Sequence, residues 1–186
     1  MPLIRLPSEH DVSYPPARGT VLLLTCMDLR LLDDIVQFMD HDNLGNRYDH
    51  IVFAGAALGA LGAPGAKDAC GTEVDYSHWK KAFEDHLGAA VDLHHVEDVY
   101  ILEHRNCAAY HKVFHVCREF GESKKEQADE EACHLKYAEL LQKEIEVFAK
   151  TRGIKLRVTK FMMGLRGTVT LLPKPKEKTQ ATGTAK

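Results

Sequence analysis

The stretch TVLLLTCMDLR (residues 20–30) runs from an uninterrupted apolar segment into three reactive side chains, Cys26, Asp28 and Arg30. A short apolar run of this kind is typical of a strand that is covered on both faces, as the strands of parallel sheets are. The stretch therefore predicts a buried strand over residues 20–25 that carries reactive groups at its carboxyl end.

Downstream of this strand, apolar segments alternate with stretches of helical periodicity. Further strands are predicted at residues 50–55, 99–104, 155–163 and 168–173, and helices at residues 31–39, 79–90, 110–117 and 135–148. A Gly/Ala-rich connection separates the second strand from the second helix. Strands that alternate with helices indicate an α/β fold, with a mostly parallel central sheet of about four to five strands flanked by helices.

Three segments are expected along the chain. Residues 1–18 carry four prolines and no sustained period, which indicates an extended amino-terminal arm. Residues 19–172 are expected to form a single α/β zinc-binding domain. The polar, lysine-rich residues 173–186 are typical of a disordered tail.

Composition excludes several classes of protein. The formal net charge of −3, without a basic block, gives no sign of a nucleic-acid partner. No apolar run reaches the roughly 20 residues that span a membrane, and the amino terminus lacks the apolar segment of a secretory signal, so a cytoplasmic location is expected. Five cysteines are an odd number, which argues against a disulfide framework and predicts free thiols.

The strand over residues 99–104 ends in EHRNC, which places His104 and Cys107 after a second buried strand. The carboxyl ends of parallel strands meet at one edge of the sheet, so Cys26 is expected to lie near this pair. Two thiolates and an imidazole favour zinc over magnesium or calcium. Three protein ligands leave a fourth position open, which is typical of a catalytic zinc site.

Asp28 and Arg30 lie two residues apart and are expected to face the same side. Asp28 is either a fourth metal ligand or the acceptor of a hydrogen bond from a metal-bound water, and Arg30 keeps the carboxylate ionised. Such a pair suits attack of a metal hydroxide on a small electrophilic carbon. His111 lies one helical turn beyond Cys107, either as a proton shuttle or as a solvated or core-edge histidine.

The chain resembles the β-class carbonic anhydrases in two motifs, Cys-x-Asp-x-Arg at residues 26–30 and His-x-x-Cys at residues 104–107. The resemblance covers roughly residues 20–173. It implies a β-carbonic anhydrase-like parallel α/β sheet, a zinc ion, and a homodimer or higher homo-oligomer. The implied reaction is the reversible hydration of carbon dioxide to bicarbonate by a metal-bound hydroxide.

Two positions depart from the family pattern. The family commonly follows its second zinc cysteine with glycine, where this chain has Ala108. The family's Arg-Asn-Ala-Gly stretch appears here as residues 53–56, Phe-Ala-Gly-Ala. Hydrolysis of carbonyl sulfide or carbon disulfide on the same scaffold is therefore one alternative, and a non-catalytic zinc protein with Asp28 closing the metal site is another.

Simpler interpretations apply to the remaining candidates. Two buried thiols and an ordinary histidine would explain the cysteine and histidine positions, but not the acid and base beside them. The glycines of GAALGALG (residues 55–62) have a GxxxGxxG spacing, which does not match a dinucleotide-binding fingerprint. Cys117 is predicted to pack in the core, and Cys133–His134 to lie outside the site.

Overall fold

The computed structural model describes residues 16–172 and contains one five-stranded sheet with the strand order β2-β1-β3-β4-β5. The strands are β1 (Val21–Cys26), β2 (Tyr48–Phe53), β3 (Asp98–His104), β4 (Arg157–Met163) and β5 (Val169–Leu171). The first four pair in parallel and β5 is antiparallel to β4. The predicted α/β fold with a mostly parallel sheet of four to five strands is confirmed.

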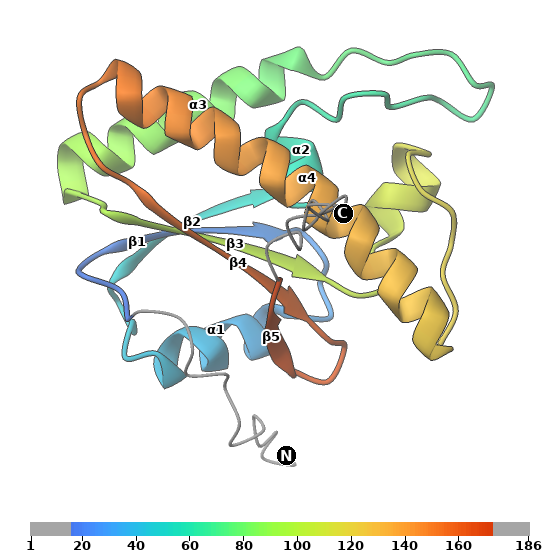
Figure 1. The fold of residues 1–186 in the computed structure, drawn as a ribbon, viewed down its shortest axis with the longest axis horizontal. Coiled ribbons are helices and arrows are strands. Elements are labelled where there is room, and N and C mark those ends of the chain that lie inside the picture. Colours follow the sequence, from blue (N-terminus) through green and yellow to red (C-terminus); the bar gives the residue numbers. More distant parts are fainter. Residues whose placement is uncertain (1–15, 173–186) are drawn as a thin grey trace, which may run out of the picture.

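Helices cover both faces of this sheet (Figure 1). They are α1 (Leu32–His41), α2 (Ala57–Ala60), α3 (Ser77–His94), the π-helical turn η1 (Ala109–Val113) and α4 (Lys124–Thr151). Figure 1 shows α2, α3 and α4 on one face and α1 on the other. Every residue of β1 and β3 is buried, as is typical of central strands that are covered on both sides.

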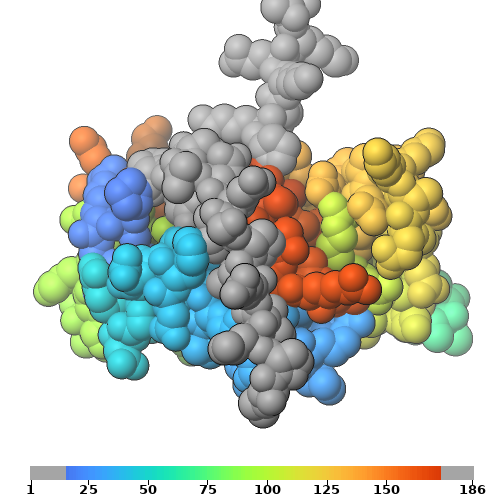
Figure 2. All heavy atoms as spheres, turned by 90° about the horizontal axis from the view of Figure 1, so that it is seen from below, coloured from blue at the N-terminus to red at the C-terminus, as the bar shows by residue number. Residues whose placement is uncertain are grey.

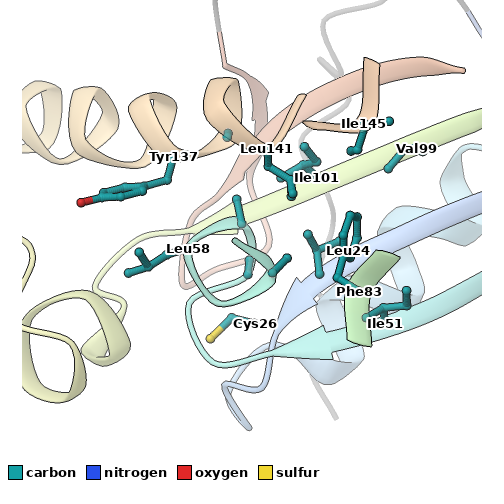
Figure 3. Packing of buried hydrophobic residues seen from close by; sticks show 14 of the residues in the cluster. Leu24, Cys26, Ile51, Leu58, Phe83, Val99, Ile101, Tyr137, Leu141 and Ile145 are labelled. Atoms are coloured by element: carbon teal, nitrogen blue, oxygen red, sulfur yellow. The ribbon is translucent and has the colours of Figure 1, made fainter. Parts of the chain in front are cut away.

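The core is divided between the two faces of the sheet. Figure 3 shows the larger cluster, in which Leu24 and Ile101 lie beneath Leu141 and Ile145 of α4, and Cys26 lies at one end of the cluster. The smaller cluster packs α1 against the β4–β5 hairpin through Phe38, among others. Figure 2 shows α1 and this hairpin, in blue and red, on one surface of the molecule.

The long helix α4 begins earlier than its apolar period predicts. The predicted helix covers residues 135–148, but the helix starts at Lys124. Ser123 caps it, because its hydroxyl accepts a hydrogen bond from the Glu126 N–H and donates one to the Glu126 carboxylate. This N-cap extends the helix through residues that contribute little to the core.

The segment after β3 differs from its prediction in two respects. The expected helix over residues 110–117 is only the short turn η1. The sulfurs of Cys117 and Cys133 form a disulfide, so the prediction that all the cysteines are thiols is wrong for this pair. Cys117 is half-buried and packs against the larger core cluster, as predicted. The two cysteines lie close together because α4 starts at Lys124 and passes beside the segment that follows η1. Cys26, Cys70 and Cys107 are free.

The Gly/Ala-rich connection after β2 is closely packed. Residues 56–60 are all buried, and they include the whole of α2. A Cβ atom at Gly59 would lie 2.4 Å from the carbonyl oxygen of Ala54, so only glycine fits there. The small residues let the chain turn tightly at the carboxyl end of β2, close to the end of β1.

Two predicted segments fall mostly or wholly outside the described residues. These are the amino-terminal arm, of which residues 1–15 are not described, and the tail at residues 173–186. Among residues 16–172, no helix combines the length and apolar character needed to cross a membrane.

Candidate metal centre

The carboxyl ends of β1 and β3 lie side by side, because these strands pair in parallel with Thr25 opposite Leu102. Cys26 is the last residue of β1 and His104 the last of β3, and Cys107 follows in the next turn. The ligand atoms of these three buried residues all lie within 4.8 Å of one another. Cys26 precedes His104 by 78 residues in the sequence. The structure therefore brings together three side chains from distant parts of the chain that could hold a metal ion.

The cluster has the dimensions of a zinc site. The sulfurs of Cys26 and Cys107 are 3.8 Å apart. Two sulfurs bound to a tetrahedral zinc at about 2.3 Å each would be separated by about 3.8 Å. The donor set of two sulfurs and one imidazole is also the set that suits zinc.

The imidazole of His104 presents the correct nitrogen to the sulfurs. Its Nδ1 lies 2.9 Å from the carbonyl oxygen of Arg105 and donates a hydrogen bond to it. This bond fixes the tautomer in which Nε2 carries a free lone pair, as is usual for a histidine that binds a metal. Nε2 is buried and has no hydrogen-bond partner among the described residues. A bound metal ion would satisfy this atom.

Backbone geometry places the two cysteines. Asn106 adopts a left-handed conformation (φ 56°), which reverses the chain between His104 and Cys107. The Gly55 N–H donates to the sulfur of Cys26 over 3.3 Å. Such a bond stabilises a thiolate, the form that binds a metal.

The two thiols influence one another strongly. The hydrogen bond with Cys107 lowers the pKa of Cys26 to about 4, with a smaller contribution from His104. The same bond, together with burial, raises the pKa of Cys107. Burial opposes the charging of His104, but the Cys26 sulfur, the Arg105 carbonyl and the Asp28 carboxylate together outweigh it and raise the pKa of the imidazole. In the absence of metal, the pair thus keeps one thiolate, on Cys26.

Asp28 and Arg30 form the expected pair at the open side of the cluster. Arg30 Nε and Nη2 donate to the two carboxylate oxygens over 2.8 and 2.6 Å, and the Arg30 backbone N–H adds a third bond of 3.1 Å. These bonds lower the pKa of Asp28 to about 2. The carboxylate is therefore ionised at any pH near neutrality.

The acid–base pair is connected to the metal cluster in two places. Asp28 Oδ2 lies 3.9 Å from His104 Nε2. Arg30 Nη2 also donates to the carbonyl oxygen of Asn106 over 3.1 Å, which ties the pair to the turn that carries Cys107. The carboxylate is thus close enough to contact a small molecule that approaches the cluster.

Other residues singled out from the sequence are placed as follows. His111 lies in η1, is half-buried, and makes no hydrogen bond or ion pair with the described residues, so its role as a proton shuttle stays a prediction. The neighbours Met27 and Leu29 are 68% and 90% exposed.

Two residues next to the site stand out in the structure: Glu103, which the sequence-based predictions do not name, and His134, which they place outside the site. Glu103 is fully buried, and His134 Nδ1 donates to its carboxylate over 2.7 Å. A single acid inside the apolar strand VYILEH was a usable signal for Glu103. No local pattern could have identified His134, whose partner is 31 residues away.

Comparisons with known proteins give distant relatives. No family model matches the chain. An uncharacterized protein of Rickettsia bellii is 29% identical over 166 residues, covering 89% of this chain and 88% of the relative. An uncharacterized protein of Rickettsia conorii is 28% identical over 166 residues, covering 89% of this chain and 77% of the relative.

Among solved structures, the chain is similar to the β-carbonic anhydrase CafA of the fungal pathogen Aspergillus fumigatus. The TM-score is 0.47 and the sequence identity 14%, over 87% of this chain and 79% of that one.

Proposed function

We propose that the protein is a carbonic anhydrase-like zinc lyase that catalyses the reversible hydration of carbon dioxide to bicarbonate. The observation that carries the proposal is the convergence of Cys26, His104 and Cys107 within 4.8 Å, with an ionised Asp28 beside them. Cys26, His104 and Cys107 would hold the ion. Bound zinc would act as a Lewis acid that makes water a nucleophile near neutral pH.

Asp28 and Arg30 have separate roles in this proposal. The Asp28 carboxylate accepts a hydrogen bond from the attacking water and fixes its orientation toward the substrate carbon. Arg30 uses both ends of its guanidinium to hold Asp28 in one position and to keep it ionised. Arg30 also bonds to the Asn106 carbonyl, so the acid–base pair and the Cys107 turn keep a fixed relative position.

The test is stopped-flow measurement of carbon dioxide hydration by zinc-loaded protein between about pH 7 and pH 9. Turnover should rise with pH. Asp28→Ala should lower kcat about 100-fold or more, because a group that positions a proton-bearing nucleophile contributes on that scale. Asp33→Ala, which changes an exposed acid on α1, is the matched control and should keep full activity. Wild-type protein that binds zinc but shows no turnover would contradict the proposal.

The substrate is tested in the same experiment. Carbonyl sulfide and carbon disulfide replace carbon dioxide in parallel runs. Turnover of either sulfur compound without hydration of carbon dioxide would keep the site and assign it to hydrolysis instead.

A second candidate function, a non-catalytic zinc site closed by Asp28, is favoured by the 3.9 Å distance between Asp28 Oδ2 and His104 Nε2. Against it, both carboxylate oxygens already accept bonds from Arg30. Crystal structures of zinc-loaded protein at acid and alkaline pH separate the two. Asp28 bound to the metal at every pH would favour the closed site.

The proposal includes a homodimer or higher homo-oligomer and a cytoplasmic location. The exposed apolar side chains of Met27, Leu29 and Leu32 beside the site support an interface between copies, because apolar groups gathered at one place are typical of interaction surfaces. Light scattering would measure the mass of the particle.

The disulfide of Cys117 and Cys133 is unusual for a reducing compartment, and trapping free thiols in intact cells would test the location.

A further inference from the structure

Glu103 is a buried carboxylic acid immediately before the histidine of the cluster, and none of its surface is exposed. A buried acid is tolerated only when hydrogen bonds satisfy its oxygens. Oε1 accepts from the Ala57 N–H over 2.9 Å, and Oε2 accepts from the Tyr110 hydroxyl over 3.2 Å and from His134 Nδ1 over 2.7 Å. These partners belong to three different elements, α2, η1 and α4.

The first oxygen of Glu103 holds the segment that supports Cys26. Ala57 begins α2, and Gly55, two residues earlier, donates its N–H to the Cys26 sulfur. Ala56, between them, has a φ of 43°, a conformation that is unfavourable for alanine and needs support from its surroundings. The bond from Ala57 to Glu103 supplies that support.

The second oxygen holds the segment that follows Cys107. Tyr110 lies one turn after this cysteine, and its backbone N–H donates to the Cys107 carbonyl over 3.2 Å. The Tyr110 ring packs against the imidazole of His134, with ring centroids 4.0 Å apart. Glu103 therefore connects the Cys107 turn to α4 through two neighbouring donors.

We propose that Glu103 is a positioning residue for the metal centre. Its carboxylate fixes the segments next to Cys26 and Cys107, and its own place in β3 fixes His104. The inference rests on the metal site proposed above, and Glu103 acts through other residues without touching the ion. Loss of such an outer partner typically weakens metal binding 10- to 100-fold.

The opposite end of β3 provides a matched control. Asp98 is also a fully buried acid, and it accepts hydrogen bonds from the Arg18 N–H and from Arg157. It lies six residues from His104 along an extended strand, far from the cluster. Asp98→Ala removes a buried carboxylate from the same strand without touching the segments that hold the cysteines.

The experiment compares the full-length wild-type protein with Glu103→Ala, Glu103→Gln, Tyr110→Phe and Asp98→Ala. Zinc affinity is measured by competition with a chromogenic chelator, and the visible absorption of the Co²⁺-loaded protein reports coordination geometry. Glu103→Ala should weaken zinc binding about 10- to 100-fold and alter the Co²⁺ spectrum. Glu103→Gln should restore part of the affinity, because its amide oxygen can still accept from Ala57. Asp98→Ala should lose stability but keep the wild-type affinity and spectrum.

The possible outcomes separate this inference from the proposed function. Equal zinc affinity and spectra for wild type and Glu103→Ala would overturn the positioning role and leave the proposed function intact. An equal loss of affinity in Asp98→Ala would also overturn it, since the effect would then be one of stability. If Glu103→Ala does not fold, the zinc affinity of Tyr110→Phe tests the positioning role instead, and a smaller loss of affinity is expected. Tight zinc binding without turnover would remove the proposed function and leave the positioning role standing.

Discussion

The two ends of β3 both carry buried charged or polar groups, and they differ in how those groups are satisfied. At the amino end, both oxygens of Asp98 accept hydrogen bonds, one from the Arg18 N–H over 2.8 Å and one from the Arg157 guanidinium. At the carboxyl end, His104 Nε2 is buried without a partner among the described residues and faces two cysteine sulfurs.

This difference distinguishes a structural polar cluster from a binding site. Buried polar atoms are almost always satisfied, because leaving one unpaired costs about 1–3 kcal/mol. The amino end follows this rule with an ion pair that needs nothing further. The carboxyl end departs from the rule at one nitrogen, and a metal ion would satisfy that nitrogen and both sulfurs together.

The largest effect is expected when a ligand is removed from the carboxyl end. Cys107→Ser should weaken zinc binding by at least about 1000-fold, because each thiolate contributes a large share of the binding free energy of a zinc site. Competition with a chelator measures the change. Cys70→Ser, which alters an exposed free thiol, is the control and should bind zinc like the wild type. Similar affinities for the two variants would show that the cluster does not bind zinc.

Breaking the ion pair at the amino end should reduce stability and spare the metal site. Arg157→Ala leaves the Asp98 carboxylate buried without its charged partner, which should lower the free energy of unfolding by about 3 kcal/mol. Urea denaturation measures this loss. Zinc affinity, measured on folded protein, should not change, and a parallel loss of affinity would mean that the two ends of β3 are coupled.

The disulfide gives the carboxyl end a covalent connection that the amino end lacks. It joins residues 16 apart, between the segment after Cys107 and α4. Replacing both Cys117 and Cys133 with serine should lower the free energy of unfolding by about 2–3 kcal/mol, as expected for a loop of this length. Comparison of wild-type unfolding with and without reductant tests the same point. An unchanged midpoint in both tests would contradict a stabilising disulfide.

The smallest expected effect is the loss of folding stability at low pH. Because Arg30 lowers the pKa of Asp28 to about 2 in the folded protein, the pair contributes stability above the unfolded pKa of about 4, and this is lost as the pH falls through 2. Solvent screening limits the contribution to less than about 1 kcal/mol. Metal-free wild type should therefore exceed Asp28→Asn in stability at pH 6, and the difference should vanish near pH 2. A difference that grows toward acid would contradict the pairing.

The sequence was most informative where its pattern was local. The apolar runs of β1 and β3 located both central strands, and the residues after them, Cys26 and His104, could be placed at one edge of the sheet by topology alone. The paired spacing of Asp28 and Arg30 likewise predicted their contact.

Long-range contacts were beyond the same reasoning. The first turns of α4 are charged, so they carry no apolar period, although Ser123 caps the helix there. The disulfide and the bond from His134 to Glu103 depend on how α4 passes the turn after β3. No spacing in the sequence fixes that crossing.

The most direct test of the metal centre is X-ray absorption spectroscopy at the zinc edge, on protein loaded with one equivalent of zinc. The account predicts two sulfur ligands at about 2.3 Å and two lighter ligands at about 2.0–2.1 Å, one of which is the His104 nitrogen. Cys107→Ser should lose one of the two sulfurs. A zinc ion surrounded only by oxygen and nitrogen, or a spectrum unchanged in Cys107→Ser, would contradict the assignment of this site.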